Sequence, residues 1–169
     1  MAVSASSITD LLEAELLALG NPRVVEHIRG LLVTPRVEMR GWDYGEPDQQ
    51  FPCWIVLEHP ASNTGIAYSE FGFGPSSPWG LLFLTGEKHM SMGMDSAWFD
   101  YLMEAYFESK ASSELPIWRV FRSQAGEYPG EAITAEGSWD DTWAEVLRLR
   151  GLKDQFRYNC SQSVYARDA

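Results

Sequence analysis

The segment from His89 to Met94 holds the residue types best suited to binding a metal ion. It reads HMSMGM, an imidazole followed by three thioethers at alternate positions. In an extended chain the three methionines would share one face, and such soft ligands select Cu(I). No cysteine is close to the segment in the sequence, and methionine also fills irregular gaps in cores and interfaces. We therefore interpret the segment as a packing or interface element and predict neither a metal site nor another cofactor.

The run Glu70–Pro75 (EFGFGP) has two glycines at the Gly-x-Gly spacing of nucleotide-binding loops. The third glycine of a dinucleotide fingerprint is missing, and so is the strand-to-helix setting that this motif requires. No Lys-Ser or Lys-Thr pair is present to form a phosphate loop. The glycines are better explained by unusual backbone conformations or by close approach of the backbone.

Residues for acid–base catalysis are few, since the chain has three histidines. The pair Glu58-His59 could supply a general base, but a histidine before a proline at a strand end is commonly structural. Asp43, Glu46 and Asp48 could collect a cation, although they lack the spacing and glycine of an EF-hand loop. No Gly-x-Ser-x-Gly or His-Glu-x-x-His motif is present. Catalysis stays open, but we favour a protein that is not an enzyme and name no catalytic residue.

The charge of the chain is the strongest indication of its partners. The net charge is −11, from 24 acidic and 13 basic residues. Such a protein repels nucleic acids and anionic membranes and is steered toward a basic partner, although acidity can also serve solubility alone. We expect a basic protein as the partner. The candidate contact residues are loop carboxylates, an acidic stripe at i, i+4 and i+8, and two tryptophans as aromatic anchors: Trp42, Asp43, Glu46, Asp48, Trp79, Asp100, Glu104 and Glu108.

Two alternative functions remain open from the sequence. One is a small-molecule-binding protein or enzyme, because pockets are mostly apolar with a few convergent polar groups. Its pocket would lie between the sheet and the helix predicted at 95–111, and its residues would be Tyr68, Glu70, Trp79 and His89. The other is a structural homo-oligomer that buries the methionine segment and exposed aromatic side chains between subunits.

Length and composition indicate a single domain over residues 1–169 with room for a core. No apolar run approaches the ~18 residues that span a bilayer. The first twenty residues hold three acids and no lysine or arginine, which is unlike a secretory signal. Cys53 and Cys160 lie in apolar or aromatic surroundings and are expected to be reduced thiols. The predicted location is the cytoplasm.

The hydrophobic pattern predicts an α+β fold, with an antiparallel or mixed sheet of five or six strands and helices packed mainly on one face. A helical hairpin is expected at 7–33, with Ser7 and Asn21 as N-caps and Thr34-Pro35 at its end. A sheet and helix core is expected at 37–122, and a C-terminal helix and edge strand at 138–166. The predicted strands are 37–44, 51–58, 65–73, 79–84 and 117–122, and the later helices are 95–111 and 139–150.

The blocks GFGPSSPWGLLFL and SMGMDSAWFDYLMEAYFES resemble small bacterial proteins to which no activity is assigned. This resemblance covers roughly residues 41–110. The whole chain is also similar in composition and architecture to immunity proteins of bacterial polymorphic toxin systems, which are small, acidic, tryptophan-rich cytosolic α+β domains without catalytic motifs. The resemblance implies a toxin-neutralising or regulatory role, and it assigns no site residue.

Overall fold

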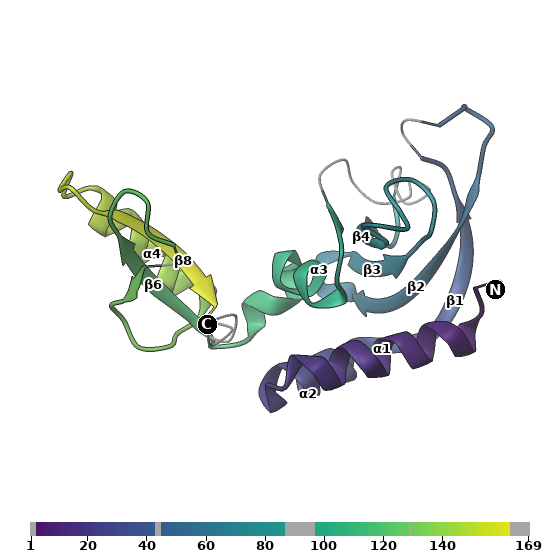
Figure 1. Cartoon of the computed structure of the whole chain (residues 1–169), viewed down its shortest axis with the longest axis horizontal. Helices are drawn as coiled ribbons and strands as arrows, with labels where there is room; N and C mark the ends of the chain where they lie inside the picture. Colours follow the sequence, from purple (N-terminus) through teal and green to yellow (C-terminus); the bar gives the residue numbers. More distant parts are fainter. Residues whose placement is uncertain (1–2, 43–44, 87–96, 129, 163–169) are drawn as a thin grey trace. The chain divides into compact units, whose positions relative to one another are not determined.

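The computed structural model describes residues 3–42, 45–86, 97–128 and 130–162 of the chain. Its helices and strands form an α+β fold with one five-stranded and one three-stranded antiparallel sheet (Figure 1), so the predicted fold class is confirmed. The chain divides into two compact units, Met1–Ser112 (unit 1) and Ser113–Ala169 (unit 2). Among the described helices, none has the length and apolar run needed to cross a membrane. The assignment of all residues to one domain stays a prediction.

Helix α1 (Ala5–Leu19) opens unit 1 and begins earlier than the sequence pattern indicated. Its N-cap is Ser4, whereas the predicted cap Ser7 lies inside the helix. The two serines form a capping box in which each side chain accepts a hydrogen bond from the other residue's backbone N–H. Gly20 ends the helix in the left-handed conformation at φ 71°.

Helix α2 (Pro22–Leu31) has the predicted cap but ends sooner than expected. The Asn21 side chain accepts hydrogen bonds from the backbone N–H groups of Arg23 and Val24. The chain then enters strand β1 (Leu32–Arg40), so Thr34-Pro35 lies within a strand and does not close a helix. Strand β1 is an edge of its sheet, where a proline can be tolerated because the outer N–H needs no ladder partner.

The five-stranded sheet follows the chain order β1-β2-β3-β4-β5, and every neighbouring pair is antiparallel. Its first four strands overlap the predicted strands 37–44, 51–58, 65–73 and 79–84, and they form an antiparallel meander. The predicted strand 65–73 is shorter in the structure, because the chain leaves the sheet after Tyr68. Besides β1, the strands are β2 (Phe51–His59), β3 (Thr64–Tyr68), β4 (Trp79–Phe83) and β5 (Trp98–Phe99).

The predicted helix 95–111 is corrected in two respects. Strand β5 occupies the start of its described part, and helix α3 (Leu102–Glu108) begins only after it. The cause is a close contact across the sheet, since the Trp98 ring lies over Gly80, where a Cβ atom would meet it at 3.3 Å. Because this strand pairing depends on a glycine eighteen positions earlier, the local sequence pattern could not indicate it.

Unit 2 has a sheet of order β7-β6-β8 with its own helix. Strand β6 (Trp118–Ser123) lies at the centre, so the predicted fifth strand belongs to this second sheet. Helix α4 (Trp139–Arg150) is capped by Ser138 as predicted. Its buried Val146 packs with Val120 of β6. The flanking strands are β7 (Glu131–Ala132) and β8 (Arg157–Gln162).

The register of the first sheet produces two rows of paired side chains on opposite faces. One row runs from Ile55 through Ala67 and Gly80 to Trp98, within the core cluster that also holds Cys53 and Leu82. The other row runs from Trp54 through Tyr68 and Trp79 to Phe99. Trp79 bonds to Glu15 of α1, so this second row faces that helix. Packing of the helices mainly on one face stays a prediction.

Candidate functional site

Glu15 is a half-buried carboxylate on α1 that is not among the predicted site residues. Its Oε1 accepts a hydrogen bond from Trp79 Nε1 at 2.9 Å, and its Oε2 accepts one from the Leu102 backbone N–H at 2.6 Å. The second bond caps α3, whose N-cap residue Tyr101 makes no side-chain cap of its own. Burial raises the pKa of Glu15 above its usual range, and the charge of Glu104 adds to the rise, while both hydrogen bonds oppose it.

Three of the four residues of the predicted ligand pocket are linked by contacts, and one of them, Trp79, bonds to Glu15. The Tyr68 and Trp79 rings meet edge to face, with centroids 5.2 Å apart. Burial raises the pKa of Tyr68, and the charge and hydrogen bond of Glu70 raise it further. Trp79 is only 1% exposed, so its ring fills the space next to Tyr68. His89 lies outside the described residues, and the pocket stays a prediction.

The predicted acidic stripe is not a single helical stripe. Asp100 precedes α3 and accepts a hydrogen bond from Ser77 Oγ at 2.6 Å, because the helix begins only at Leu102. Glu104 is half-buried and close enough to Glu15 to affect its pKa. Only Glu108 is fully exposed on the helix.

The other predicted contact residues lie apart from this stripe in the sequence. Glu46 and Asp48 are exposed in the connection between β1 and β2, and Asp43 lies outside the described residues. Trp42 is partly buried against the sheet core and meets Phe73 edge to face at 5.7 Å. The prediction that Trp79 is a surface anchor is wrong, because its ring is buried and has no exposed area for contact with a partner.

The arginines of unit 1 are largely engaged by its own carboxylates. Arg29 makes two hydrogen bonds to Glu13, at 2.7 and 2.6 Å. Arg36 pairs with Glu58 and with Glu38. Arg40 is fully buried and donates to Glu38 and to the Phe83 carbonyl oxygen.

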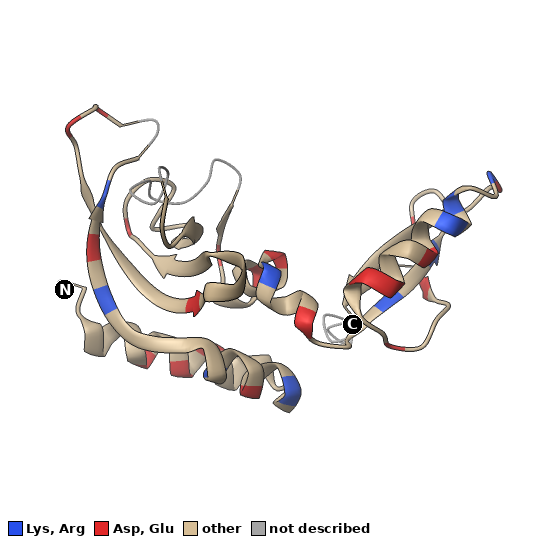
Figure 2. Ribbon diagram, turned by 180° about the vertical axis from the view of Figure 1, so that it is seen from behind, with Lys and Arg blue, Asp and Glu red and all other residues tan. Residues whose placement is uncertain are grey.

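These internal pairs leave an unbalanced set of exposed acids. Unit 1 holds 15 acidic and 6 basic residues, a net charge of −9. Figure 2 shows both kinds of charge along its ribbon. Within the described part of unit 1, five exposed carboxylates have no salt bridge or side-chain hydrogen bond. They are Asp10, Glu26, Glu46, Asp48 and Glu108.

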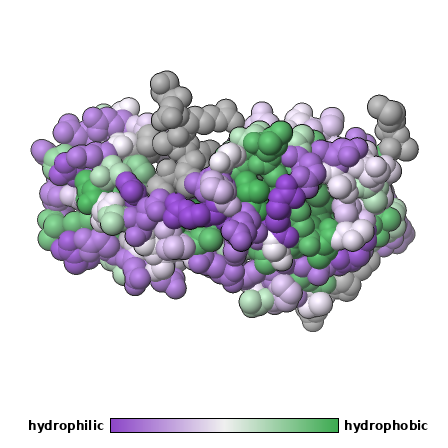
Figure 3. Space-filling model, turned by 90° about the horizontal axis from the view of Figure 1, so that it is seen from below, coloured by the Kyte–Doolittle hydropathy of each residue, from purple (hydrophilic) through white to green (hydrophobic). Residues whose placement is uncertain are grey.

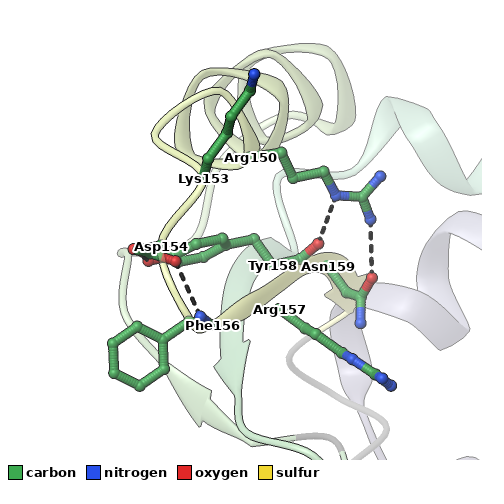
Figure 4. Close-up of a pocket in the computed structure, with 7 residues that line it drawn as sticks. All are labelled: Arg150, Lys153, Asp154, Phe156, Arg157, Tyr158 and Asn159. Atoms are coloured by element: carbon green, nitrogen blue, oxygen red, sulfur yellow. Dashed lines mark hydrogen bonds between the residues drawn. The ribbon is translucent and has the colours of Figure 1, made fainter.

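Unit 2 has a hollow of about 410 Å³ where α4 ends and β8 begins (Figure 4). Arg150 donates to the Tyr158 carbonyl oxygen at 2.9 Å and to Asn159 Oδ1 at 3.0 Å. Asp154 accepts from the Phe156 N–H at 2.9 Å and from the Tyr158 hydroxyl at 2.6 Å. Two further cations line the hollow, Lys153 and Arg157, but Figure 4 shows their side chains pointing away from each other. The polar groups therefore hold α4 and β8 together and do not converge on a ligand.

A groove of about 460 Å³ lies between α1 and α2. It is lined mainly by apolar side chains, including Leu17, which is 85% exposed. Figure 3 views the molecule from the side of these helices and shows green apolar atoms between purple hydrophilic ones in its right-hand part, where unit 1 lies. The charged residues at the groove, Glu13 and Arg29, are paired with each other. The groove offers apolar contact area without groups that could do chemistry.

Metal and thiol chemistry find little support in the described residues. Among them, no three His, Cys, Asp or Glu side chains lie close enough to hold a metal ion. The methionine segment proposed above as a packing element lies outside the described range. Burial raises the pKa of Cys53 to about 12 and that of Cys160 to about 11, so both free thiols are protonated at neutral pH.

Comparison with known proteins finds no matching family, no matching curated protein and no matching solved structure. The function is therefore argued from the residues of this chain alone.

Proposed function

We propose that this protein is a non-enzymatic acidic binding protein, which binds and neutralises or regulates a basic protein in the cytoplasm. The carboxylates of unit 1 supply the charge for this interaction. The observation that carries the proposal is that arginines of unit 1 pair with carboxylates of the same unit and leave other carboxylates over. Three of its four described arginines, Arg29, Arg36 and Arg40, are bonded to carboxylates of the same unit, while five of its described carboxylates are exposed and make no ion pair or side-chain hydrogen bond.

Exposed, unpaired carboxylates suit an interaction that begins with long-range attraction. A surface with one excess sign of charge raises the rate of encounter with an oppositely charged partner. Each exposed ion pair adds only about 0.2–1 kcal/mol, so several pairs are needed for a stable complex. A negative surface of this kind also discriminates against nucleic acids and anionic membranes, because both carry negative charge.

The proposal is tested with two variants that change the net charge equally. E46Q/D48N removes two negative charges from unit 1, and Q124K/Q155K adds two positive charges to exposed positions of unit 2. Binding of each variant and of the wild type to a set of small basic proteins is measured by calorimetry at about 50 mM salt. We expect E46Q/D48N to bind about 2- to 30-fold more weakly than the wild type, with a much smaller change for Q124K/Q155K.

Equal weakening by both variants would mean that only the net charge matters and that unit 1 has no special role. Absence of binding to any basic protein in the set would contradict the proposed function itself.

A further inference from the structure

Five aromatic rings lie together on the sheet face that carries Ile55 and Ala67, and we call them the aromatic roof. Their ring contacts form two groups, since Phe51 stacks on Phe71 with centroids 5.0 Å apart, and Phe73 lies 5.7 Å from Trp42 and 6.1 Å from Trp98. Three of the rings, those of residues 42, 51 and 98, pack against the buried core cluster of this face. The aromatic roof consists of Trp42, Phe51, Phe71, Phe73 and Trp98.

Two rings of the aromatic roof are exposed to solvent. Phe71 is 42% exposed and Phe73 is 44% exposed. Both lie in the connection between β3 and β4, which holds them at the surface and out of the core. Exposed phenylalanine costs solvation free energy, and adjacent exposed rings often mark an interaction site. Interface hot spots are likewise enriched in aromatic residues.

Acidic side chains follow directly in the loop beside this ring cluster. Gly45 lies next to the Phe51 ring, because a Cβ atom placed there would be 3.7 Å from it. The next residue, Glu46, starts a turn in which its carbonyl oxygen accepts a hydrogen bond from the Gln49 N–H at 2.9 Å. This turn also carries Asp48, and both carboxylates are exposed without a salt bridge among the described residues. The turn with the unpaired carboxylates thus follows Gly45, which lies beside Phe51, the ring that stacks on the exposed Phe71.

We propose that the aromatic roof and the carboxylates of Glu46 and Asp48 bind arginine side chains of the basic partner, in preference to lysine. This inference rests on the proposed function and names the surface and the kind of residue it recognises. A guanidinium is planar and weakly hydrated, so it stacks on an aromatic ring while its N–H groups pair with a carboxylate. A lysine ammonium carries the same charge but cannot stack in this way. The ring–carboxylate combination therefore distinguishes two side chains that charge alone treats equally.

The test uses two synthetic peptides of equal length and charge, one rich in arginine and one rich in lysine. Binding of both to the full chain is measured by calorimetry at about 50 mM salt. We expect the wild type to bind the arginine peptide about two- to five-fold more tightly. F71L/F73L keeps apolar bulk and removes the ring faces, so it should bind both peptides equally. The control variant is Y128A, which removes a 90% exposed ring from unit 2 and should keep the preference.

Loss of the arginine preference in F71L/F73L, with the preference kept in Y128A, supports the inference. Equal affinity of the wild type for both peptides would overturn it while leaving the proposed function intact, and so would an unchanged preference in F71L/F73L. If neither peptide binds, both the inference and the proposed function fail.

Discussion

Unit 1 and unit 2 each use a charged side chain to bond a helix end to a neighbouring element, but the charges are opposite. In unit 1, the Glu15 carboxylate accepts the N–H of Leu102 at the start of α3. In unit 2, Arg150 in the last turn of α4 donates to the Tyr158 carbonyl oxygen of β8. These choices follow the helix dipole, which favours anions at the N-terminal end and cations at the C-terminal end.

The two units also differ in what remains after such internal bonds are made. Unit 1 has 15 acidic and 6 basic residues, whereas unit 2 has 9 acidic and 7 basic residues, a net charge of −2. Internal pairing can therefore neutralise most of unit 2, but it must leave carboxylates over in unit 1. Unit 1 therefore keeps an excess of carboxylates beyond what its own basic residues can pair with.

The largest expected effect comes from removing the ring that Glu15 contacts in unit 1. Trp79→Ala should lower the free energy of unfolding by about 3–5 kcal/mol, because it opens a cavity in a site where the ring is only 1% exposed. Urea denaturation followed by circular dichroism measures the change. Trp143→Ala in unit 2 is the comparison, and it should cost less because that ring is only partly buried. A loss below about 1 kcal/mol for Trp79→Ala would contradict the packing described for this residue.

Loss of the carboxylate at Glu15 should have a smaller effect. Glu15→Ala leaves Trp79 Nε1 and the Leu102 N–H without their acceptor, so we expect a cost of about 1–2 kcal/mol for a partly solvated site. The matched control is Glu13→Ala, which removes an exposed ion pair with Arg29 and should cost clearly less. Urea midpoints measure both variants. An equally small loss of stability in both variants would mean that the Glu15 hydrogen bonds do not stabilise the packing of α1 against α3.

In unit 2, Arg150→Lys tests whether a cation alone is enough at the end of α4. Lysine keeps the charge but cannot donate at once to the Tyr158 carbonyl oxygen and to Asn159 Oδ1. We expect a loss of about 0.5–1.5 kcal/mol, measured from the thermal unfolding midpoint of the full chain. Unchanged stability would show that the two hydrogen bonds of Arg150 are dispensable and that a positive charge near the C-terminal end of the helix dipole is enough.

The smallest expected effects are changes of stability with pH. They fall in an acid pH range for unit 1 and in an alkaline pH range for unit 2. Burial raises the folded-state pKa of Glu15 above its usual value of 4.5. The extra stability that the protonated form gives over the ionised form is therefore fully present below that value and is lost as the pH rises through the raised pKa. The hydrogen bond to Asp154 raises the pKa of Tyr158 above its usual 10.0, so the corresponding loss occurs in alkali.

Urea midpoints measured across both pH ranges check this assignment. Glu15→Gln should flatten only the acid part of the profile and Tyr158→Phe only the alkaline part. If Glu15→Gln changed stability in the alkaline range, or Tyr158→Phe in the acid range, the assignment would be contradicted.

The sequence predicted the elements whose signals are local. The apolar run at 51–58 is strand β2, and the pattern after Ser138 is helix α4, since neither depends on a distant residue. The predicted start of α3 was wrong, because the observed start depends on the Trp98 ring lying over Gly80. The strand at 117–122 was correctly predicted, but its sheet was not, because its partner β8 begins only at Arg157.

The candidate site was less predictable for the same reason. Glu15 looked like a surface acid on an amphipathic helix, and its two hydrogen-bond donors lie 64 and 87 residues further along the chain. Its position three residues after the buried Leu12 was the available signal, since it places Glu15 at the edge of the apolar stripe. The exposure of Glu46 and Asp48 agreed with a loop rich in charge, which is a local property.

The most direct test of the central claim is the salt dependence of binding. The affinity of the wild type for the small basic protein that it binds most tightly is measured between about 50 and 200 mM salt, where the screening length shortens markedly. If the excess carboxylates of unit 1 drive association, the affinity falls steeply across this range and E46Q/D48N has a shallower slope than the wild type. An affinity that does not change with salt, or equal slopes for the two proteins, would contradict the account.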